Sequence, residues 1–195
     1  MPIYSGTAEV GKIYIGNAEV AKVFNNAGAE IWSAGFVIWD YGKSTDYTGG
    51  WTLRSSGNGS ATLGDGNGAI YTYANNTANS YRAYFTTQKI PTSKYNYLTI
   101  KWAGRNGLGS YSTWGCARMA LTTSTSISWS NGYPTGNFVS GFQVSDNDTS
   151  LTVTTTTWNI SSVTTDYYLC TLANSGVDTY GNYWAQNYLY QAILT

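Results

Sequence analysis

The sequence predicts an all-β protein, in which a small N-terminal antiparallel meander precedes a jelly-roll-type β-sandwich. Short segments rich in β-branched and aromatic residues recur along the chain, separated by clusters of Gly, Asn, Asp and Ser. No stretch of ten residues keeps the hydrophobic period of a helix. The first 22 residues contain a decamer written almost twice, "IYSGTAEVGK" and "IYIGNAEVAK", which predicts a small unit separate from the rest.

The repeat predicts the elements of the first domain, residues 1–35. Gly6-Thr7 and Gly16-Asn17 have the composition of two-residue hairpin turns, and the text between them, "AEVGKIYI", is an eight-residue strand. A looser third copy, "VFNNAGAEIW", has a longer turn, "NNAG". We therefore expect an antiparallel meander here and a sandwich over residues 36–195.

Both faces of the predicted meander mix apolar residues with charged ones, so neither face is plainly a core. A sheet this small cannot bury enough surface alone. We expect it to be an adaptor that packs against another chain, with simple packing on its own chain as the alternative. The residues expected to be buried at that contact are Ile13, Tyr14, Ile15, Val23, Phe24 and Trp32.

The sandwich is predicted from nine short strands in about 155 residues, a number typical of two packed sheets. In chain order, we expect strands near Trp51–Arg54, Ala69–Tyr73, Tyr81–Thr86, Tyr97–Trp102, Ala117–Thr122, Phe138–Val144, Leu151–Asn159, Tyr167–Leu172 and Tyr188–Leu194.

Composition excludes several classes of function. The chain has 10 Lys plus Arg and 10 Asp plus Glu, so its net charge is zero, and it lacks the basic surface expected of a nucleic-acid-binding protein. It has no His, which excludes Ser-His-Asp catalysis and histidine-built metal sites. It shows no transmembrane span, and its start lacks the features of a signal peptide, so we expect synthesis in a cytoplasm without membrane insertion.

The cysteines and the acidic clusters are expected to be structural. Cys116 and Cys170 lie in segments with the composition of β-strands and are interpreted as small buried side chains. The alternative is a disulfide, if their strands are neighbours. The clusters "GDGNG" around Asp65 and "SDNDTS" around Asp146 could offer some oxygen ligands for calcium, but the same residues favour tight turns. We predict no metal site and no cofactor.

Three predicted loops are rich in aromatic and amide side chains: "AGRNGLGSYSTWG", "SISWSNGYPTGN" and "SGVDTYGNYWAQN". Aromatic rings stack on the apolar face of a sugar, while amides and charged groups bind its hydroxyls. The same rings could instead anchor a protein interface or tether the loops to the core. The candidate glycan-binding residues are Trp129, Tyr133, Arg105, Tyr111, Trp114, Tyr180 and Tyr183, of which Trp129 is the first choice.

Hydrolysis of a glycan is not expected. A glycosidase needs two carboxylates at a fixed distance. After Glu30 the chain has no Glu and only a few Asp residues, all in or beside segments with the composition of turns. We therefore predict that the protein is not an enzyme.

The repeat text "IYxGxxEVxKIYIGxxEVxKV" resembles short N-terminal repeats in structural proteins of bacteriophages that infect Gram-positive bacteria. The resemblance covers about the first 35 residues. It implies attachment to other virion proteins of the tail or capsid, localisation in the virion, and assembly as a homo-oligomer, most commonly a homotrimer.

A second stretch, "TGGW" followed by "YFTTQKIPTSKYNYLTIKW", resembles the start of β-sandwich domains in phage tail proteins, which are similar to carbohydrate-binding modules. Together the resemblances imply a tail- or fibre-associated structural protein that displays a receptor-binding sandwich for host-surface glycan. The alternative is a capsid decoration or head-fibre protein with a purely structural role and no glycan ligand.

Overall fold

The computed structural model describes residues 35–195 except 76–79, 108–115, 131–132, 136, 147–149, 176, 179–180 and 183, together with six short strands between residues 4 and 33. For those six strands, and for a few strand residues near the gaps, the backbone alone is described. The described chain is all-β apart from one short 3-10 helix, η1 (Thr92–Lys94), which confirms the predicted fold class. None of its helices is long and apolar enough to cross a membrane.

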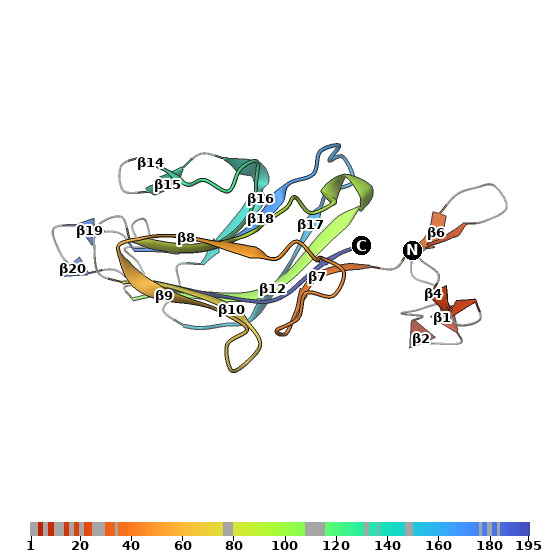
Figure 1. Cartoon of the computed structure of the whole chain (residues 1–195), viewed down its shortest axis with the longest axis horizontal. Helices are drawn as coiled ribbons and strands as arrows, with labels where there is room; N and C mark the ends of the chain where they lie inside the picture. The colour runs from red at the N-terminus through yellow and green to blue at the C-terminus, as the bar shows by residue number, and fades with distance from the viewer. Residues whose placement is uncertain are drawn as a thin grey trace.

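Two antiparallel sheets stack face to face to form the sandwich (Figure 1). The first sheet has the strand order β17 (Thr154–Asn159), β12 (Tyr97–Asn106), β21 (Ala185–Leu194), β10 (Ile70–Asn75) and β9 (Asn58–Leu63). A sixth strand, β7 (Phe36–Asp40), pairs with the end of β21. The last strand of the sheet in chain order, β21, thus lies at its centre.

The second sheet has five strands in the order β16 (Phe138–Asp146), β13 (Cys116–Thr122), β18 (Tyr168–Asn174), β11 (Tyr81–Thr86) and β8 (Trp51–Ser56). Two two-stranded hairpins occur in connections of the sandwich: β14 (Ser128–Ser130) with β15 (Tyr133–Thr135), and β19 (Val177–Asp178) with β20 (Gly181–Asn182). All nine predicted strands of the sandwich overlap observed strands. The sequence did not predict β7 and β9.

A bend between β8 and β9 carries the chain from one sheet to the other. Gly57 lies at φ +64° and Gly59 at φ +150°, conformations that residues with a side chain rarely adopt. The Arg82 guanidinium donates hydrogen bonds to the backbone carbonyls of Ser56, Gly57 and Gly59 at 2.9–3.1 Å. The bend therefore joins the edge strands of both sheets into one ribbon.

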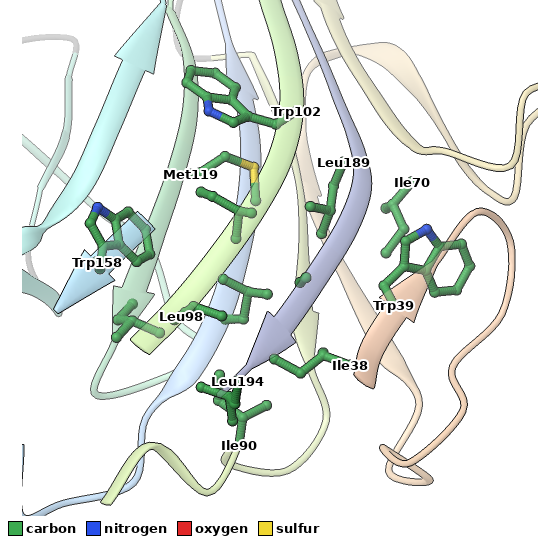
Figure 2. Packing of buried hydrophobic residues seen from close by; sticks show 14 of the residues in the cluster. Ile38, Trp39, Ile70, Ile90, Leu98, Trp102, Met119, Trp158, Leu189 and Leu194 are labelled. Atoms are coloured by element: carbon green, nitrogen blue, oxygen red, sulfur yellow. The ribbon is translucent and has the colours of Figure 1, made fainter. Parts of the chain in front are cut away.

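The core lies between the two sheets and is built from alternate residues of each strand. Figure 2 shows Leu98, Trp102 and Leu189 of the first sheet meeting Met119 of the second. A polar crosslink spans the same space, because the buried Asn187 amide of β21 donates to the Arg118 carbonyl at 2.8 Å and to the Thr171 hydroxyl at 3.1 Å.

The structure confirms the interpretation of Cys170 as a small buried side chain. Their strands, β13 and β18, are neighbours, but Cys116 pairs with Asn174 and Cys170 with Ala120, so the two are out of register. Cys170 is a free, fully buried thiol, as expected for a small apolar side chain. This excludes the disulfide alternative. The side chain of Cys116 lies outside the described residues.

The N-terminal region forms three hairpins at the predicted turns. Around residues 6–7, β1 (Tyr4–Ser5) pairs with β2 (Ala8–Glu9), and ten residues later β3 (Tyr14–Ile15) pairs with β4 (Ala18–Glu19) in the same register. The third copy pairs β5 (Lys22–Phe24) with β6 (Glu30–Ser33) across the longer turn. Among the described residues each hairpin is a sheet of its own. The middle of the expected eight-residue strand, residues 10–13, lies outside them.

Candidate functional site

The outer faces of the two sheets differ in chemistry. On the second sheet, the outward residues Phe85, Cys170 and Leu172 are fully buried, because Ile127 and Phe138 pack over them. On the first sheet, the outward positions of β10 and β21 carry partly exposed tyrosines between buried core residues. This uncovered aromatic face is the candidate functional site.

Four tyrosine rings form a continuous row across this face. The Tyr71 and Tyr188 rings, directly opposite on paired strands, have centroids 4.9 Å apart. The Tyr188 and Tyr190 rings are 6.2 Å apart and within 8° of parallel, and Tyr41 adjoins Tyr190 at 6.0 Å. We call Tyr41, Tyr190, Tyr188 and Tyr71 the ring row.

A β-bulge in β21 and the end of β7 position the Tyr190 and Tyr41 rings at one end of the row. Lys101 of β12 pairs with Gln191 and Trp102 pairs with Leu189, so Tyr190 is the extra residue of a β-bulge, a device that redirects a side chain. Tyr41 follows β7, and its amide N–H donates to the Tyr190 carbonyl at 2.9 Å. The ring row thus rests on hydrogen-bonded strands along most of its length.

The Tyr41 backbone is held by the loop between β9 and β10. Its φ of +41° is unusual for a residue with a side chain. Gly68 lies so close to this backbone that a Cβ atom there would collide with the Tyr41 carbonyl. The Trp39 indole N–H donates to the Gly68 carbonyl at 3.1 Å, which ties the loop to β7.

A groove of about 550 Å³ opens beside the Tyr41 end of the ring row. This volume lies within the range typical of small-molecule sites. Its lining combines aromatic, aliphatic, amide and cationic groups, supplied by Tyr41, Asn67, Lys101, Val153 and Tyr190. A ligand lying on the ring row would therefore have a recess at one end.

At the other end lies Trp184, which packs against the backbone of Gly107, directly after β12. A Cβ atom on Gly107 would collide with the indole ring, so only glycine leaves room for it. The Trp184 and Tyr73 rings lie 6.3 Å apart, and the Arg105 guanidinium carbon lies 5.3 Å from the Trp184 ring centroid. Trp184 is thus held in place by three separate contacts.

Polar groups border the rings. The Arg105 Nε donates to the Gln186 side-chain oxygen at 2.8 Å, and the Gln186 amide nitrogen lies 3.4 Å from the Tyr71 hydroxyl. Exposed hydroxyl residues occupy strands on both sides, where Thr62 of β9 is paired with Tyr71, and Thr155 of β17 is paired with Lys101. The face therefore offers stacking surfaces in its middle and hydrogen-bonding groups along its sides.

Partial burial raises the pKa values of the Tyr71, Tyr188 and Tyr190 hydroxyls above the usual 10.0. For Tyr188, the nearby Arg105 charge acts in the opposite direction and lowers the pKa, while Asp65 raises it. All three phenols therefore stay neutral near pH 7, where each can both donate and accept a hydrogen bond. This chemistry suits binding rather than proton transfer.

The carboxylates near this face are hydrogen-bonded within the protein, Asp65 to backbone and Asp40 to a side chain. The Asp65 Oδ1 accepts the amide N–H groups of Asn67 and Ala69, both at 2.9 Å, as expected for a turn residue. The Asp40 Oδ1 accepts from the Gln191 amide at 3.0 Å. In the part of the chain that the structure describes, no three His, Cys, Asp or Glu side chains gather as they would around a metal ion. The Asp146 side chain lies outside that part.

Of the predicted glycan-binding residues, the structure brings Arg105 to this face, on strand β12 rather than in a loop. Trp129 lies in β14 opposite Pro134, and Tyr133 lies in the partner strand β15, in the connection between two strands of the second sheet. Their side chains lie outside the described residues, as do residues Tyr111, Trp114, Tyr180 and Tyr183 entirely. The loop site stays a prediction.

The same holds for the predicted attachment residues. Tyr14 and Ile15 lie in β3, Val23 and Phe24 in β5, and Trp32 in β6, with only their backbone described. Ile13 lies outside the described residues.

Sequence reasoning missed the ring row itself. Its signal is the alternation Tyr-x-Tyr in "IYTYAN" and again in "NYLYQ", which places two rings on one face of each strand. Alternation along the strand could also have identified Lys101, because it lies at an outward position of β12 between the buried Ile100 and Trp102.

No protein-family model matches this chain, and no curated protein matches it. Among solved structures, it is similar to the glycoside hydrolase domain of Endo-D from Streptococcus pneumoniae R6, at 12% identity and a TM-score of 0.43, over 74% of this chain and 21% of that one. It is also similar to a structure titled "CBM4 structure and function", at 12% identity and a TM-score of 0.35, over 82% of this chain and 85% of that one. At this level of similarity neither match identifies a family for the chain.

Proposed function

We propose that this protein is a non-catalytic module that binds a glycan chain along the ring row. The observation that carries the proposal is the pair Tyr188 and Tyr190, whose rings lie within 8° of parallel and 6.2 Å apart on an uncovered sheet face. A sugar ring has an apolar face of C–H groups, and a flat aromatic ring stacks on it. Rings at successive outward positions of one strand can therefore contact successive parts of an extended polysaccharide.

The setting of the rings supports binding of sugars in particular. The groups beside them, the Gln186 amide, the Tyr71 hydroxyl and the threonines of the flanking strands, match the hydroxyl groups around a sugar ring. Strands held by a sheet also lose little conformational entropy on binding, which favours affinity at a shallow site.

The experiment is a glycan array followed by calorimetry on the polysaccharides that bind. Tyr188→Ala should weaken binding by about 1 kcal/mol or more, because it removes the ring at the centre of the row. Tyr168→Ala is the matched control, since Tyr168 is a half-buried tyrosine on β18 of the other sheet. Loss of affinity in Tyr188→Ala with normal binding in the control supports the proposal. Equal affinities in the two variants would overturn it.

We also propose that the N-terminal repeats attach the module to a bacteriophage virion, on its tail or fibre. Two observations support this. The decamer sequence resembles N-terminal repeats of phage structural proteins, and the hairpins β1–β2 and β3–β4 have the same register at an offset of ten residues. Identical units in tandem offer a partner the same contact more than once. The alternative role, a capsid decoration protein without a glycan ligand, predicts binding to virions and no binding to any glycan.

A further inference from the structure

The candidate site carries two cations without an acidic partner. Lys101 and Arg105 both point outward from β12, and neither forms an ion pair with a described carboxylate. Two carboxylates beside this face are already hydrogen-bonded, Asp65 to two backbone N–H groups and Asp40 to the Gln191 side-chain amide. The two cations are therefore free to bind an anion that comes with a ligand.

Aromatic contacts hold both cations on the face rather than letting them extend into solvent. The Lys101 Nζ lies 5.4 Å from the Tyr41 ring centroid, and the Arg105 guanidinium lies 5.3 Å from that of Trp184. Arg105 is fixed further by the bond from its Nε to Gln186. Among the described residues, its terminal nitrogens have no partner on this face, so they can form the paired hydrogen bonds that a carboxylate accepts.

The spacing of the two cations indicates the size of the ligand. They lie four positions apart along β12, which corresponds to about 13 Å at the rise of a strand. A monosaccharide cannot reach both ends of such a span, whereas a glycan chain lying along the sheet can. Three rings of the ring row lie on β21, which neighbours β12, and on β10 beyond it, so a bound chain could contact rings and cations together.

We propose that the ligand is an anionic polysaccharide whose carboxylate groups bind Lys101 and Arg105 while its sugar rings stack on the ring row. This inference rests on the proposed function and specifies its ligand class. A polynucleotide is also anionic, but its affinity depends on neutralising many phosphates, and this chain has zero net charge and two such cations on the face.

The test uses the full-length protein and three carboxylated polysaccharides: polygalacturonate, alginate and hyaluronan. Each is paired with its carboxyl-reduced product, which keeps the sugar chain and loses the charge. At low salt, at least one acidic form should bind several-fold more tightly than its reduced partner. Raising the NaCl concentration to about 0.5 M should remove most of this difference, because the charges lie at the surface.

The variants Lys101→Met and Arg105→Gln should each weaken binding of that acidic form by about two- to five-fold, the range of a surface ion pair. Binding of the corresponding carboxyl-reduced polysaccharide should fall by a smaller factor, because it lacks the carboxylates that these two cations bind. The matched controls are Lys94→Met and Arg54→Gln, which remove the same charges from exposed positions off this face and should leave both affinities unchanged. Thermal melts check that each variant is folded, and Lys101→Met tests the inference independently of Trp184.

Different results would overturn different claims. Equal binding of acidic and reduced forms, or binding of neutral array glycans alone, would overturn the anionic ligand and leave glycan binding intact. Poly(dT) binding as tight as that of the best acidic glycan would assign the cations to a polynucleotide and overturn the inference. If no polysaccharide bound, acidic or neutral, the proposed function itself would fail.

Discussion

Asn187 and Tyr188 are adjacent residues whose side chains lie on opposite faces of β21. Tyr188 faces outward in the ring row, whereas the Asn187 amide lies between the sheets and donates to groups of β13 and β18. Burying an amide is costly unless it is hydrogen-bonded, and here the nitrogen is bonded to both strands, whereas the oxygen is buried without a partner among the described residues. Asn187 therefore fixes how the two sheets sit against each other, and through β21 it positions the ring row.

Asn187→Leu keeps the approximate size of the side chain and removes its donors, leaving the Arg118 carbonyl and the Thr171 hydroxyl without this partner. We expect the free energy of unfolding to fall by about 1–3 kcal/mol, measured by urea denaturation. The comparison variant is Gln143→Leu, in which an exposed amide on the edge strand β16 is replaced. A loss no greater in Asn187→Leu than in Gln143→Leu would contradict a role in joining the sheets.

The Cys170 thiol should be unreactive in the folded protein. Burial raises its pKa far above the usual value, because a thiolate would lose its hydration, so at pH 8 the reactive anion is scarce. In a Cys116→Ser variant, a thiol reagent such as DTNB should react slowly with the native protein and rapidly in guanidinium chloride. Rapid labelling of the native protein would show that the second sheet opens easily at β18.

At the scale of elements, the bend between β8 and β9 depends on glycine. Gly59→Ala would place a methyl group against the Tyr73 carbonyl at a φ of +150°. We expect a loss of about 2–4 kcal/mol in unfolding free energy, from backbone strain and the collision together. Gly66→Ala is the matched control, because a Cβ atom there meets nothing within 4 Å and should leave the melting temperature unchanged. Similar melting temperatures for the two variants would show that the bend relaxes at little cost.

The same elements show what the sequence could predict. Strands such as β11, with its aromatic residues between turn signals, were found at the correct bounds. β9, "NGSATL", was missed because its edge position leaves it exposed and free of any hydrophobic pattern. β12 was predicted too short because "AGRN" has the composition of a loop, although Ala103 and Gly104 are buried in the sheet.

The candidate site was harder to predict for a reason of topology. The alternating tyrosines of β10 and β21 are visible in the sequence, but their strands are more than 100 residues apart in the chain. The addition of Tyr41 depends on β7 pairing with the end of β21, which no local pattern specifies. Local composition identified Arg105, whereas the assembly of the ring row required the order of strands in the sheet.

For the whole molecule, we predict that the hairpins and the sandwich have separable roles. Deleting residues 1–35 should leave the melting temperature and the glycan affinity of the sandwich unchanged, because β7 begins at Phe36 and completes the first sheet. We expect light scattering to give a homotrimeric mass for the full chain, and the deletion should abolish both this assembly and incorporation into virions. Tyr188→Ala, which leaves the repeats intact, should keep both. Normal incorporation of the shortened protein, or a monomeric mass for the full chain, would refute the adaptor role.

The central place of β21 also sets the order in which the protein can mature during synthesis. A ribosome makes β9, β10, β12 and β17 before it makes β21, which must insert between β12 and β10. Until then the two halves of the sheet have no shared hydrogen bonds, and long-range pairing of this kind folds slowly. Tyr188 and Tyr190 arrive with that same strand. A chain released before β21 is made therefore has neither a closed first sheet nor a complete ring row, so the proposed glycan site forms only together with the finished sheet.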